Sequence, residues 1–224
     1  MDSGLLYTIY CLADIPCAAI AAVCGALCFN RARKQKGDQT FFLLLCGFFF
    51  CIFLCDVFFI LSWLVIDFPF VISPGDLSWA GSLVFLITAD MGLMDSWTDE
   101  QKQAAKKYKP PALFAPAVCI GSCAVFIAIY PEIVANYILY CVPTTILSYY
   151  ALMMWLAGKK CGVQIKLRNF HLVILVWIAL QLFHDLFTTL GFDYGYAVPS
   201  TIFIWLIIVP IPMIYLAAKE GVSA

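Results

Sequence analysis

Seven long runs of apolar residues constrain the fold of this chain more than any other feature. A helix needs roughly 20 mostly apolar residues to cross the hydrocarbon of a bilayer. Barrel strands would instead appear as short alternating segments. We therefore predict an all-α, polytopic membrane protein built as a seven-transmembrane-helix bundle. The predicted helices cover residues 4–29, 40–66, 78–97, 112–130, 133–157, 170–191 and 196–218.

The composition excludes an ordinary soluble protein. Hydrophobic residues make up 64% of the chain and charged residues only 12%, whereas a soluble domain is about half apolar and a quarter charged. Seven helices use most of the chain, so we expect a single transmembrane domain over residues 1–224 and no soluble domain. The N-terminus has no basic region ahead of its apolar run, which disfavours a cleaved signal peptide. Nothing in the sequence supports nucleic-acid binding.

The basic residues predict the orientation. All thirteen Lys and Arg residues fall after the first, third, fifth and seventh predicted helices. In the connections after the second, fourth and sixth predicted helices, the charged residues are all acidic. Cytoplasmic loops are enriched in Lys and Arg. We therefore expect the N-terminus outside, the C-terminus in the cytoplasm, and a location in a bacterial-type cell (cytoplasmic) membrane.

One basic connection, "SWTDEQKQAAKKYKPP", predicts a short helix of its own. Thr98 and Gln101 form a capping-box pattern, and Pro110 is expected to stop the helix. We predict a basic helix over residues 99–109 at the cytoplasmic surface. It is either a solvated positive-inside loop or a contact surface for acidic lipid head groups or a signalling partner. In the second case the contacts would come from Lys102, Lys106 and Lys109.

Ionisable residues inside membrane helices are candidates for function, because burying one costs about 3 kcal/mol on insertion scales. Gln181, His184, Asp185 and Thr188 follow the spacing i, i+3, i+4, i+7 and form one polar stripe on the sixth predicted helix. Such a stripe should face the bundle and avoid lipid. Two other predicted helices carry similar stripes, the first with Tyr7, Tyr10, Cys11 and Asp14, and the fifth with Tyr137, Tyr140, Cys141, Thr144 and Ser148.

Counting 1.5 Å per residue places three carboxyl groups at similar depth. Asp14, Asp56 and Asp185 fall in the outer half, and Asp90 lies deeper, nearer the cytoplasm. We predict a polar pocket open to the outside that binds a small ligand, a cation or protons, with pH-dependent occupancy through the imidazole. The alternatives are interhelical hydrogen bonds that only hold the bundle together, or catalysis. The predicted ligand-binding residues are Asp14, Asp56, Tyr137, Tyr140, Gln181, His184, Asp185 and Thr188.

The sequence shows no set of catalytic, metal-binding or cofactor-binding residues. It has no GxSxG or HExxH motif, only two histidines, and no CxxC pair among its eleven cysteines. We interpret the cysteines as small packing residues. His171 is placed at the cytoplasmic end of the sixth helix, away from the outer polar stripe. The last helix has no lysine for a retinal Schiff base, so we expect no cofactor and favour a protein that is not an enzyme.

The layout resembles the N-terminal seven-helix sensor modules of some bacterial histidine kinases and diguanylate cyclases. The segments that carry the likeness include "NRARKQKGDQTFF", "CDVFFILSWL", "KPPALFAPAV", "YCVPTTILSYYALMMWLAGKK" and "YAVPSTIFIWLIIV". The resemblance covers nearly the whole chain. It implies a sensor or receptor that binds a small ligand or ion. Because we see no output domain, the protein is expected to signal through a partner chain.

A weaker resemblance is to the lysoplasmalogenase-like membrane family. Asp56 and Asp185 stand where that family carries aspartates in two membrane helices. The chain departs from the family in having one helix fewer, no basic-proline stretch before the first aspartate helix, and Asp90 where a histidine is expected. This resemblance implies a membrane lipid hydrolase as the enzyme alternative. A small-molecule or ion transporter is a further alternative, although we find no internal repeat of the kind that transporters show.

Overall fold

The computed structural model describes residues 3–34, 37–64, 72–158, 165–194 and 197–222, and the regular structure in these ranges is helical. Seven helical stretches within them are long and apolar enough to cross a membrane, which confirms the predicted helical membrane bundle. The elements are α1 (Ser3–Lys34), α2 (Gln39–Leu64), α3 (Pro74–Asp95), α4 (Asp99–Ala105), η1 (Lys106–Tyr108), α5 (Lys109–Ala112), α6 (Phe114–Ile129), η2 (Pro131–Ile133), α7 (Val134–Ala157), α8 (Ile165–Tyr194), α9 (Ala197–Ile208) and α10 (Pro210–Val222).

The short basic segment between α3 and α6 is helical, as predicted, but it is built from three pieces. The Thr98 hydroxyl accepts a hydrogen bond from the Gln101 amide, and the Gln101 side chain accepts one from the Thr98 amide, which completes the capping box. The α-helix ends at Ala105 and continues as the 3₁₀ turn η1. Pro110 does not stop the helix, because it lies in the first turn of α5, where its missing N–H costs nothing.

The seventh membrane stretch is broken in its middle. The amide of Val209 donates to the Leu206 carbonyl at 3.3 Å, three residues back, and α10 begins at Pro210. Proline has no N–H to continue the α-helical ladder, so the chain changes from α9 to α10 at this point.

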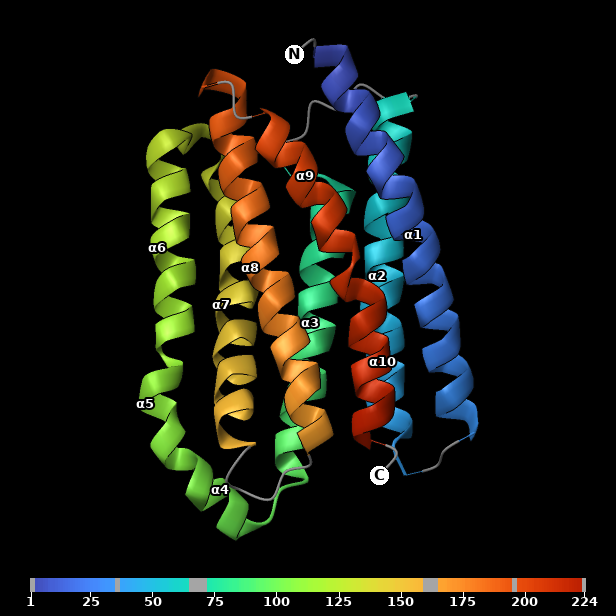
Figure 1. Ribbon diagram of the computed structural model, residues 1–224, viewed down its shortest axis with the longest axis vertical. Helices are drawn as coiled ribbons and strands as arrows, with labels where there is room; N and C mark the ends of the chain where they lie inside the picture. The colour runs from blue at the N-terminus through green and yellow to red at the C-terminus, as the bar shows by residue number, and fades with distance from the viewer. Residues whose placement is uncertain (1–2, 35–36, 65–71, 159–164, 195–196, 223–224) are drawn as a thin grey trace.

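Six of the seven stretches close into a ring around one core (Figure 1). Neighbours around the ring are α1, α2, α3, α7, α8 and the α9–α10 pair, which packs back against α1. The remaining stretch, α6, lies outside the ring against α7 and has a smaller contact with α8. A residue on α6 therefore reaches the core less readily than one on any other stretch.

Aromatic side chains fill the middle of the ring. Trp177 of α8 meets Phe48 of α2 edge-on at 5.5 Å and Trp79 of α3 at 5.1 Å between ring centroids. Trp177 and Phe48 are almost completely buried. In lipid, such packing contacts are a main source of helix association. The outer surface exposes other large apolar side chains, including Leu64 and Phe114, as expected for a lipid-facing surface.

The two ends of the bundle differ in charge. The described Lys and Arg residues belong to the helix ends drawn at the bottom of Figure 1, which we call the basic end. Asp14, Asp56, Asp76 and Asp185 lie in the opposite half of their helices, which we call the acidic half. The separation agrees with the predicted alternation of charge, and the assignment of the basic end to the cytoplasm stays a prediction.

Candidate functional site

Five helices contribute side chains to one acidic cluster. We define it as Asp14 of α1, Asp56 of α2, Asp76 of α3, Tyr140 of α7 and Asp185 of α8. Asp14 and Asp56 are electrostatic neighbours, and Asp76 and Asp185 both lie close to Tyr140. Cys55 links the two groups, because it interacts electrostatically with three of the four carboxyls. Asp14 and Asp56 are thus direct neighbours, whereas Asp185 is connected to them through Tyr140 and Cys55.

Asp56 is the most deeply buried member of the cluster. Its side chain is only 6% exposed, and it accepts a hydrogen bond from the Cys17 thiol of α1. Its Oδ2 atom has no hydrogen-bond partner among the described residues. A buried carboxyl oxygen without a partner is costly, so this atom marks a position where a proton or a ligand donor would be stabilised.

Asp76 had been expected in an outer connection, and the structure gives it two roles. It occupies the third position of α3 and completes a capping box with Ser73, whose amide and hydroxyl both donate to Asp76 Oδ2, at 2.6 and 2.8 Å. Its other oxygen, Oδ1, accepts a hydrogen bond from the Tyr140 hydroxyl. Asp76 therefore stabilises the start of α3 and joins that helix to α7.

The polar stripe on α8 forms in part. Gln181 donates to Asp185 Oδ1 at 2.9 Å, which confirms that these two residues share a face. His184 is half-buried on the same helix. Thr188 lies in α8, but its side chain falls outside the described residues, as do the side chains of Tyr7, Tyr10 and Cys11 on α1.

The predicted stripe on α7 divides between two neighbours. Tyr140 faces α3, as its bond to Asp76 shows. The ring of Tyr137 packs against Phe126 of α6 at 5.4 Å, and Cys141 donates to the Cys119 carbonyl of α6. The structure therefore places Tyr140 in the acidic cluster and Tyr137 at the contact with α6.

The acidic cluster is rich in carboxyl groups and poor in positive charge. The Lys and Arg residues in the described part of the chain belong to the basic end. Among the described residues, no group of three or more His, Cys, Asp or Glu side chains is arranged to hold a metal ion.

A second ionisable pair lies nearer the basic end. His171 of α8 and Asp90 of α3 are 3.2 Å apart between Nε2 and Oδ1, and both are buried. Both residues were predicted near that end, but not as a pair. Their similar distance from the basic ends of α3 and α8 was the signal that connects them.

Comparisons with known protein families, with curated proteins and with solved structures find no match for this chain.

Proposed function

We propose that this integral membrane protein is receptor-like and binds a small, positively charged organic ligand in the acidic cluster. The observation that carries the proposal is Asp56, a buried carboxyl with an unpartnered oxygen beside a second carboxyl, Asp14. Two carboxylates in a medium of low dielectric repel each other unless a proton or a cation joins them. A ligand ammonium group would supply both the charge and the hydrogen-bond donors.

Asp56 and Asp14, on the neighbouring helices α2 and α1, would provide the first acceptors for such a ligand. Asp185 of α8, which is bonded to Gln181 and is an electrostatic neighbour of Tyr140, would contribute to the same acidic half of the bundle. Ammonium groups donate up to three hydrogen bonds. A bound ammonium group would therefore form hydrogen bonds to carboxyl groups on more than one helix. These interhelical bonds would be present only when the ligand is bound.

A route from the cluster to the basic end runs along α3 and α7. In the acidic half these helices are joined by the Asp76–Tyr140 hydrogen bond. At the other end, Trp97, which follows α3, packs in one small apolar cluster with Ala105 of α4 and with Met154 and Ala157 of α7. A shift of α3 against α7 would thus move the basic segment. We propose that this segment contacts an acidic surface of a signalling partner through Lys102, Lys106 and Lys109, all of which are exposed.

The test is a binding assay on the whole chain in lipid nanodiscs. Primary amines, quaternary ammonium ions, alkali-metal cations and carboxylates of similar size are screened by thermal shift and then by calorimetry. We expect at least one amine to stabilise the protein, by about 2.7 kcal/mol at a hundredfold excess over its Kd. Asp56→Asn should weaken that binding at least tenfold, or about 1.4 kcal/mol.

Asp95→Asn is the matched control, since Asp95 is exposed at the basic end of α3. This variant should bind the amine as the native chain does. Equal losses in the Asp56 and Asp95 variants would contradict the proposed site. Stabilisation by carboxylates but by no cation would contradict the proposed charge of the ligand.

A further inference from the structure

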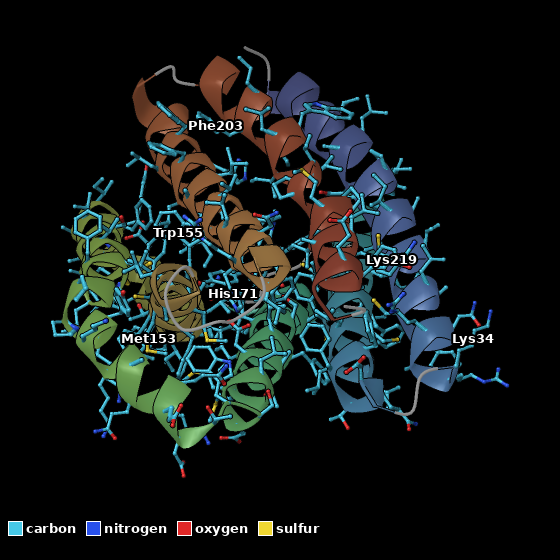
Figure 2. All side chains as sticks on the ribbon, turned by 60° about the horizontal axis from the view of Figure 1, so that its bottom comes forward. Lys34, Met153, Trp155, His171, Phe203 and Lys219 are labelled. Atoms are coloured by element: carbon cyan, nitrogen blue, oxygen red, sulfur yellow. The ribbon has the colours of Figure 1, made fainter. Side chains whose placement is uncertain are left out.

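The buried pair Asp90–His171 joins α3 to α8 in the half of the bundle away from the acidic cluster. His171 is 1% exposed and Asp90 0%. Figure 2 looks onto the basic end and shows His171 toward the interior, whereas Lys34 projects outward. The proposed ligand site does not involve either residue, so an inference about this pair stands independently of it.

The position of one proton on the imidazole ring follows from the backbone. His171 Nδ1 lies 2.7 Å from the carbonyl oxygen of Leu167, one turn earlier on α8. A carbonyl oxygen only accepts hydrogen bonds, so Nδ1 must carry the hydrogen. In the neutral ring, Nε2 then holds a lone pair and is an acceptor.

The contact between Nε2 and Asp90 Oδ1 therefore needs a proton of its own. At 3.2 Å, a lone pair facing a carboxylate oxygen would be repulsive, whereas a proton between them makes a hydrogen bond. The proton belongs either to a neutral Asp90 or to a positively charged His171. The geometry thus requires one proton between Nε2 and Oδ1, whichever of the two residues carries it.

The second oxygen of Asp90 decides between these two forms. Asp90 Oδ2 is buried and has no hydrogen-bond partner within the described part of the chain. An ionised carboxylate loses far more than a neutral carboxyl when one oxygen is left unpartnered in a medium of low dielectric. The orphaned atom favours the neutral form, in which Oδ1–H donates to Nε2.

We propose that Asp90 and His171 form a proton-binding site that is loaded with one proton, donated by Asp90 to His171, and that loss of this proton breaks the contact between α3 and α8. The released proton passes to water and leaves a carboxylate on Asp90. That carboxylate then faces the lone pair on Nε2, so the hydrogen bond becomes a repulsion. The pair is a proton-dependent latch between two helices of the ring.

The charged surroundings of His171 are sparse. The bounds of α6, α7 and α9, which pack against α8, contain no Asp, Glu, Lys, Arg or His, and α2 contains only Asp56, in the acidic half. Arg168 lies one turn away on α8, but its guanidinium stacks over Trp155 of α7 at 5.1 Å. The other charged groups on adjoining helices are Asp76 of α3, which lies in the acidic half, and Asp95 of α3 with Lys219 and Glu220 of α10, which are exposed. Asp90 is thus the acid that pairs with the imidazole.

Nitrogen-15 NMR of the whole chain in nanodiscs tests the proton positions, because the chain has only two histidines to label. The ring signals lost in His171→Gln are those of His171. We expect Nδ1 to be protonated and Nε2 to be an unprotonated acceptor at neutral pH. An imidazolium signal for His171, or a proton on Nε2 with none on Nδ1, would overturn the assignment.

Infrared spectroscopy tests the acid and the latch. The native chain should show a protonated-carboxyl band that is absent in Asp90→Asn and present in the control Asp95→Asn. As pH rises, this band should disappear while amide hydrogen exchange at the basic ends of α3 and α8 speeds up beyond its intrinsic pH dependence. Asp90→Asn keeps a donor to Nε2 but has no proton to lose. Once the intrinsic pH dependence is subtracted, its amide exchange rate at these helix ends should not change with pH. Equal pH responses in the native chain and Asp90→Asn would refute the latch.

Discussion

Replacing Asp76 tests whether the acidic cluster is one connected structure. This carboxyl receives two hydrogen bonds from Ser73 in the capping box of α3 and one from Tyr140 of α7. Loss of a cap costs about 1 kcal/mol, and an interhelical hydrogen bond in a membrane protein averages about 0.6 kcal/mol, with a maximum near 1.7. Asp76→Ala should therefore lower the free energy of unfolding by roughly 2 kcal/mol.

The two contributions separate in a double-mutant cycle. Tyr140→Phe removes only the hydroxyl that reaches Asp76, so it should cost about 1 kcal/mol. In the Asp76→Ala background the same change should cost almost nothing, because the acceptor is already gone. We expect a coupling free energy near 1 kcal/mol between these residues.

The measurement is reversible unfolding in bicelles, with each variant compared under identical lipid conditions. Tyr149→Phe, on the same helix, is the matched control and should show no coupling to Asp76→Ala. Additive costs for Tyr140→Phe and Asp76→Ala, within about 0.3 kcal/mol, would refute the connection between α3 and α7. The route proposed from the acidic cluster to the basic segment would then lose its first step.

Two further variants probe the basic end. Trp97→Ala removes a side chain that is 7% exposed and packs with Met154. The free energy needed to open α4 locally should therefore fall by about 3 kcal/mol. Unchanged amide exchange in α4 would contradict the role of Trp97 in holding α4 against the bundle. Arg31 stacks over Phe42 at 4.8 Å and donates to the Lys219 carbonyl at 3.4 Å. Arg31→Ala should therefore speed amide exchange in the last turn of α10 by about fivefold, for a loss of about 1 kcal/mol; equal exchange rates in variant and native chain would argue against that contact.

The membrane helices were predictable because length and apolarity suffice to identify them. The hydrocarbon sets a minimum run of apolar residues, and each predicted run overlaps one of the seven helical stretches that are long and apolar enough to cross a membrane. The capping box at Thr98 was also predictable, since its two residues act within one turn. Both signals are local, so no knowledge of packing is needed to find them.

The arrangement of the helices was not predictable by the same means. In lipid, a helix face that packs against a neighbour and a face that meets acyl chains are both apolar, so periodicity does not separate them. For this reason the sequence did not show that α6 lies outside the ring, nor that Tyr137 faces α6 while Tyr140 faces α3. Asp76 was overlooked because the third helix was predicted to begin at residue 78, which left Asp76 in the preceding connection, whereas α3 begins at Pro74.

The two ionisable levels are separated in a way that bears on mechanism. Along α3, Asp90 lies about 21 Å from Asp76, and along α8, His171 lies about 21 Å from Asp185, at 1.5 Å per residue. Between these levels the ring contains the packed aromatic side chains of Trp177 and Phe48.

A buried aromatic layer offers few partners to a hydrated proton or ion, and burying a charge there is costly. Both levels nevertheless involve α3 and α8, since Asp76 and Asp90 share one helix and Asp185 and His171 share the other. A change at either level therefore acts on the same two rigid elements. Movement of α3 against α8 could therefore couple the two levels without passage of an ion between them, as the proposed receptor-like function needs.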